Sequence, residues 1–76
     1  MTVRVDGDIV FLEGRCGAED AESLFLALQE RPDLAVDASA LVRLHLAVAQ
    51  ILLTIRPRVH APPNQLILAR TVFSLF

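Results

Sequence analysis

The stretch from Leu34 to Ile55 constrains the fold most, because the spacing of its apolar residues changes partway along. It opens with a short apolar run that ends at Asp37 and is too short for a helix that contributes to a core. After small residues at 38–40, apolar side chains recur with helical spacing at Leu44, Val48, Ile51, Leu52 and Ile55. The stretch therefore predicts a strand, a turn and a helix, with the change of period between Asp37 and Arg43.

The segments before this stretch also have clear patterns. Two β-rich runs, Thr2–Val5 and Ile9–Glu13, flank the sequence Asp6-Gly7-Asp8, and this predicts a hairpin because glycine tolerates the positive φ of a tight turn. From Gly17 the spacing becomes helical, with an apolar stripe of Ala18, Ala21, Leu24, Phe25 and Leu28. Leu26 and Ala27 fall off that stripe, and we expect them to be exposed.

The start and end of this first helix follow from its polar residues. Glu19, Asp20 and Glu22 place negative charge in its first turns, where it complements the helix dipole. Pro32 disfavours helical angles at the residue before it, so the helix should stop near Glu30.

The remaining residues complete the predicted fold. Three prolines within residues 56–64 predict a loop, Gln65–Ala69 predicts a buried strand, and residues 70–76 form a short apolar tail. The order is therefore β-β-α-β-α-β in one domain over residues 1–76. This order predicts an α/β (α+β) fold, a small mixed four-stranded sheet with two helices on one face.

The strand, turn and helix resemble the STAS domain, the fold of bacterial anti-sigma factor antagonists. Asp37 and Ser39 match the D/N-x-S pattern that follows a strand in that family, and Gly14 stands where the family has a glycine after its second strand. For Gly14, a plain strand terminator is an equally good interpretation. Val42 and Leu44 suit the hydrophobic positions of the motif. The resemblance implies a STAS-like fold.

The second half of the family motif is different here. Without gaps, His45 stands where the family has Asp, Leu46 and Ala47 where it has Ser or small residues, and Val48 where it has Gly. The phosphorylated serine of the family falls on Ala47, which has no hydroxyl group. The resemblance therefore implies a module without a phosphoserine switch.

The resemblance also implies a partner-binding edge that runs from Asp37 to Val48. Its residues are Asp37, Ser39, Arg43, His45, Ala47 and Val48. The implied function is that of a non-enzymatic adaptor or regulatory subunit in bacterial signalling, with an anti-sigma-type kinase or another signalling or transporter component as its protein partner. The alternative is a small-molecule or lipid-binding accessory domain, for example of a phospholipid transporter, with an apolar groove where STAS domains have a terminal helix.

The residues themselves allow a simpler role for Asp37. A carboxylate directly after a strand commonly accepts hydrogen bonds from backbone N–H groups one to three residues on, here those of Ser39 or Ala40. This role stabilises the turn and is compatible with a binding edge.

Composition excludes several classes of function. Seven basic residues, all arginine, face nine acidic ones for a net charge of −2, which disfavours a nucleic-acid partner. Polar residues interrupt every apolar run before the ~20 residues that a membrane span needs. Arg4, Asp6 and Asp8 interrupt the apolar residues around the first strand, so we expect no signal peptide there and a location in the cytoplasm. A hydrophobic content of 54% in 76 residues, with Phe73, Leu75 and Phe76 near the end, predicts self-association, for example as a dimer.

Few residues could carry out chemistry. Cys16 and a histidine, His45 or His60, could form a nucleophilic pair oriented by Asp37, but a single cysteine beside a helix start is more often a small buried residue. The sequence contains no glycine-rich phosphate loop and no cluster with metal-ligand spacing. We therefore expect no enzyme activity, no cofactor and no metal.

Overall fold

The computed structural model describes residues 2–63 of the chain, which form a sheet covered by two helices. The predicted hairpin is confirmed: β1 (Val3–Asp6) pairs antiparallel with β2 (Ile9–Leu12), and Gly7 in its turn has a φ of 61°. β2 then pairs in parallel with β4 (Ala35–Asp37), and β4 pairs in parallel with β6 (Arg58–Ala61). The spatial order of this mixed sheet is β1-β2-β4-β6.

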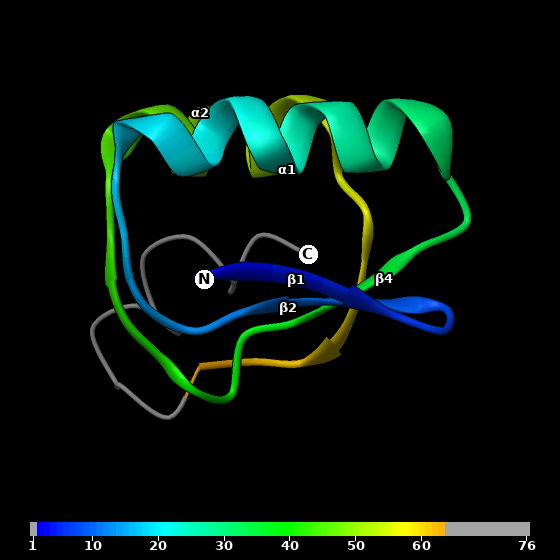
Figure 1. Cartoon of the computed structure of the whole chain (residues 1–76), viewed down its shortest axis with the longest axis horizontal. Helices are drawn as coiled ribbons and strands as arrows, with labels where there is room; N and C mark the ends of the chain where they lie inside the picture. The colour runs from blue at the N-terminus through cyan, green and yellow to red at the C-terminus, as the bar shows by residue number, and fades with distance from the viewer. Residues whose placement is uncertain (1, 64–76) are drawn as a thin grey trace.

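The two helices, α1 (Ala18–Glu30) and α2 (Leu46–Ile55), lie side by side on one face of this sheet (Figure 1). The predicted architecture is thus confirmed: the strands of the larger sheet and the helices follow the order β-β-α-β-α-β. Both helices begin at the same end of the molecule and run in the same direction (Figure 1). α1 stops at Glu30, as predicted from Pro32.

The last strand of the sheet is not where the sequence predicted it. Residues 56–64 were expected to form a loop, but β6 lies within them. Pro57 and Pro62 lie just outside β6, so each of its residues keeps a backbone N–H for the sheet. The strand predicted at Gln65–Ala69 and the apolar tail at 70–76 lie outside the described residues, and so does the lipid groove of the alternative function.

A second sheet was not predicted at all. β3 (Gly14–Cys16) and β5 (Leu41–Leu44) form a parallel pair that rises from the larger sheet to the helix layer, at the left of Figure 1. The predicted helix therefore begins at Leu46, later than the change of period suggested. Gly14 has a φ of 67°, and its N–H donates to the carbonyl of Ala40 at 2.9 Å, so it both ends the hairpin and starts the second sheet.

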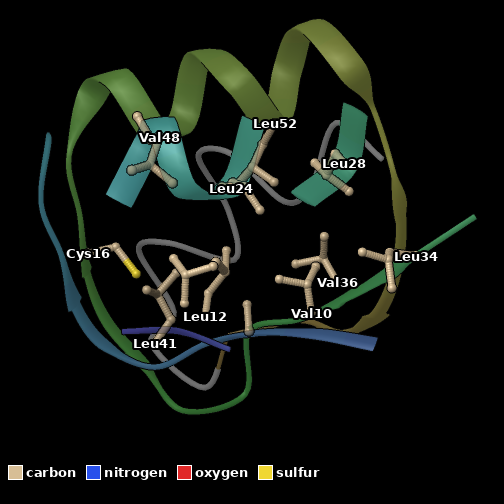
Figure 2. Close-up of a cluster of buried hydrophobic side chains, with 13 residues drawn as sticks. Val10, Leu12, Cys16, Leu24, Leu28, Leu34, Val36, Leu41, Val48 and Leu52 are labelled. Carbon is tan, nitrogen blue, oxygen red and sulfur yellow. The ribbon is translucent and has the colours of Figure 1, made fainter. Parts of the chain in front are cut away.

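The core lies between the helices and the larger sheet (Figure 2). Its largest fully buried side chains are Leu12, Leu24, Leu34, Leu41, Leu52, Val10, Val36 and Val48. The predicted helical stripe is confirmed within α2, where Val48 and Leu52 are buried and Ile51 and Ile55 pack partly buried against the core. Leu44, the first member of the predicted stripe, lies on β5 instead and also packs partly buried against the core.

The predicted stripe of α1 is correct only in its centre. Ala21, Leu24 and Leu28 are buried, but Ala18 is exposed and the side chain of Phe25 is 40% exposed. Leu26 is exposed as predicted, whereas Ala27 was expected to be exposed and packs partly buried against the core. The buried face of α1 therefore leaves out Ala18 and Phe25 and includes Ala27.

Candidate functional site: the edge from Asp37 to Val48

The carboxylate of Asp37 organises the turn at the end of β4. Its Oδ1 accepts a hydrogen bond from the backbone N–H of Ser39 at 3.0 Å and another from the Ser39 hydroxyl at 2.7 Å. These two bonds, the backbone bond first, hold the pKa of Asp37 below its usual value, and the charge of His60 on β6 adds to the effect. The predicted turn-stabilising role of Asp37 is confirmed.

Removing this carboxylate should cost a measurable amount of stability. We expect Asp37→Ala to lower the free energy of unfolding by about 1 kcal/mol, because the turn loses both hydrogen bonds. Since the pKa of Asp37 is lowered in the folded state, its contribution is present above the pKa of an unfolded aspartate and disappears as the pH falls through the folded value. Urea unfolding at pH 6 and pH 3 measures this difference.

The matched control for that prediction is Asp37→Asn. The amide oxygen can still accept the bonds from Ser39 but does not titrate. The stability of this variant should therefore depend less on pH between 6 and 3 than that of the wild type. An equal pH dependence for both proteins would show that Asp37 is not the group responsible.

His45 directly follows β5 and is the N-cap of α2. Its ring Nδ1 accepts a hydrogen bond from the backbone N–H of Ala47 at 3.0 Å, and its carbonyl accepts from Val48 and Ala49. Its own N–H donates to the carbonyl of Cys16 at 2.9 Å and so connects β5 to the end of β3. This capping role was not predicted, although His45 is the one residue from 41 to 46 whose side chain offers an uncharged acceptor.

The same region contains an open pocket of about 280 Å³ between the end of the β3–β5 pair and the starts of both helices. Its lining residues are Arg15, Cys16, Gly17, Arg43, Leu44 and His45. Arg43 and His45 belong to the predicted site, whereas Arg15 and Gly17 do not. Nothing in the spacing of the sequence indicated them, because their position depends on the pairing of β3 with β5.

The predicted edge therefore separates into two places. Asp37 and Ser39 lie in the turn before β5, and Arg43 and His45 lie at the far end of that strand, roughly 13 Å away for four extended residues. Ala47 is partly buried, with its N–H engaged by His45. Val48 must be removed from the partner-binding set, because its side chain is fully buried in the core and cannot contact a partner.

Cys16 is a buried, free cysteine. Burial, followed by the negative charge of Asp20, raises the pKa of its thiol to about 11, so the thiolate is scarce at neutral pH. The side chain points into the core (Figure 2), and its Sγ is 3.8 Å from the carbonyl oxygen of Thr2. Asp37, the proposed orienting group, lies at the other end of β5. The structure therefore does not assemble the nucleophilic arrangement considered from the sequence.

Two further properties of residues 2–63 bear on the site. In this part of the chain, no group of three or more His, Cys, Asp or Glu side chains is placed to hold a metal ion. Neither α1 nor α2 has the length and apolar character to cross a membrane, and no other helix is described.

Comparison with known proteins finds no family model, curated protein or solved structure that matches the chain.

Proposed function

We propose that the chain is a non-enzymatic protein-interaction module, similar to an anti-sigma factor antagonist, that acts as an adaptor or regulatory subunit in bacterial signalling. Two structural features support this proposal. The order of strands and helices in the larger sheet is the one that the resemblance to STAS domains implies. The Asp37–Ser39 turn, on which the resemblance partly rests, is well formed.

The observation that carries the proposal is the surface at the start of α2. Leu46, its first residue, has a side chain that is 69% exposed, and the neighbouring Arg43 and His45 are exposed as well. The hydrogen bond from His45 to Cys16 and the cap on Ala47 hold this surface in place. An exposed leucine beside arginine on rigid backbone suits a protein contact, because binding buries apolar area without ordering a loop.

This surface has no site for a phosphate switch. Leu46 and Ala47 begin α2, and neither has a hydroxyl group. Ser39 is the only hydroxyl residue between positions 38 and 48, and its Oγ donates to Asp37. We therefore expect binding to be constitutive with respect to phosphorylation. The direct test of the function is capture of a protein partner from native cell extract and loss of that capture when exposed residues of this surface are changed.

We expect no phosphate transfer to this surface from a kinase of the anti-sigma type. Intact-mass measurement after incubation with such a kinase and ATP should show an unchanged mass. Ala47→Ser, which restores a hydroxyl at the family's phosphorylated position, is the matched variant. A phosphate on the wild type that maps to residues 38–48 would show that the assigned switch position is wrong, with Ser39 as the residue to examine.

A further inference from the structure

Two arginines stand next to each other in the small sheet. Arg15 on β3 and Arg43 on β5 are register partners in the parallel pair, so their side chains leave the same face of the sheet. Both are exposed and both line the pocket described above. Like charges placed opposite each other on paired strands destabilise the pair, so this arrangement calls for an explanation.

Neither arginine is neutralised within the part of the chain that the structure describes. Across residues 2–63, no ion pair or hydrogen bond links the side chain of Arg15 or Arg43 to another residue, and residues 64–76 contain no Asp or Glu. The other arginines of residues 2–63 have partners: Arg4 with Glu13, Arg31 with Asp8 and Asp33, Arg56 with the carbonyl of Leu53, and Arg58 with the carbonyl of Asp33. Of the six arginines of residues 2–63, the two that line this pocket are thus the ones whose guanidinium groups have no ion pair or hydrogen bond.

The rest of the pocket adds hydrogen-bond donors. Because Nδ1 of His45 accepts from Ala47, the neutral ring carries its proton on Nε2, which is then a donor. α2 begins at the pocket with no acidic residue in its first turn, so its positive dipole end is not offset there. Gly17 contributes no side chain to the wall. The N–H groups of two guanidinium side chains and of one imidazole can donate hydrogen bonds to the several oxygens of a phosphate group.

We propose that the pocket lined by Arg15, Arg43 and His45 binds the phosphate group of a small molecule, either inorganic phosphate or a phosphate monoester. The volume of about 280 Å³ is enough for the phosphate and a small part of the attached group. The inference rests on the arginine pair and the pocket, and it does not depend on the proposed protein-interaction function.

Two carboxylates work against this binding. Asp20 accepts the N–H of Gly17 at 2.7 Å, and its negative charge acts on Cys16 in the pocket wall. Glu19 lies beside the pocket wall: its carboxylate oxygens are 3.1 and 3.2 Å from where a Cβ on Gly17 would stand. Its negative charge lowers the affinity for an anion. Replacing Glu19 should therefore strengthen phosphate binding at this pocket. Non-specific attraction of anions to the protein surface would not be strengthened at this pocket in particular.

The test is a titration of the isotope-labelled protein followed by its backbone amide NMR spectrum, with inorganic phosphate, with glycerol phosphate, and with chloride at matched ionic strength. We expect saturable shifts at residues 15–17 and 43–47 with both phosphates and none that saturate with chloride. Tighter binding of glycerol phosphate would identify a monoester as the ligand, and equal or tighter binding of inorganic phosphate would identify the free ion. Either result supports the pocket.

The variants decide whether the binding is specific. Arg15→Gln and Arg43→Gln should each weaken phosphate binding at least tenfold, and Glu19→Gln should tighten it severalfold. Arg56→Gln removes the same charge at the opposite end of α2 and should leave the affinity unchanged. The dispersion of each spectrum reports whether the variant is folded. Equal weakening by Arg56→Gln, or shifts with chloride that match those with phosphate, would overturn the proposal.

Discussion

Replacing Leu24 with alanine should lower the free energy of unfolding by about 3 kcal/mol, within the 2 to 5 kcal/mol found for buried leucines. The side chain of Leu24 has no exposed surface and points from α1 into the core between the helices and the sheet (Figure 2). Its removal forfeits buried apolar area and leaves a cavity that two helices and a sheet can fill only in part. Native proteins have a free energy of unfolding of roughly 0.05 to 0.15 kcal/mol per residue. For a chain of 76 residues the expected loss is therefore a large share of the total.

The control is the same substitution two positions along the same helix. Leu26 is 50% exposed, so Leu26→Ala should change the free energy of unfolding by less than about 1 kcal/mol. Urea unfolding followed by circular dichroism measures both variants on one scale. Similar losses for the two would mean that α1 does not pack with Leu24 inward.

Reversing the charge at the start of α2 should have the largest effect on binding. We expect the double variant Arg43→Glu with His45→Glu to weaken capture of the native protein partner by more than tenfold, which is about 1.4 kcal/mol. Both side chains are exposed at the end of β5, and two negative charges would repel a partner surface that complements the present positive one. Capture from native cell extract by immobilised wild-type and variant protein measures the effect.

Two controls separate lost binding from lost structure. His45 caps α2, so the double variant should also lose up to about 1 kcal/mol of stability, whereas Arg43→Glu with His45→Asp keeps a good capping side chain. Arg58→Glu reverses a charge on β6, away from this surface, and should capture the partner normally. If the double variant is folded and captures the partner as well as the wild type, the start of α2 is not the interface.

Local chemistry explains why much of the fold could be predicted from the sequence. Gly7 allows the turn of the hairpin, Pro32 ends α1, and Asp37 closes the turn after β4 through bonds to a residue two positions away. The buried stripe of α2 follows in the same way from the period of its apolar residues. Each of these features depends on residues that are close together in the sequence, so a local pattern is enough to predict it.

The tertiary structure decided the features that depend on contacts between residues far apart in the chain. β3 and β5 are three and four residues long, and neither is stable without the other, which lies 25 or more residues away. Their pairing moved the start of α2 to Leu46, made His45 its cap, and placed Arg15 beside Arg43 at one pocket. The sequence by itself determined the hairpin turn, the turn at Asp37 and the end of α1, because neighbouring residues set those. Which strands pair and which arginines meet depends on long-range contacts whose partners no local pattern specifies.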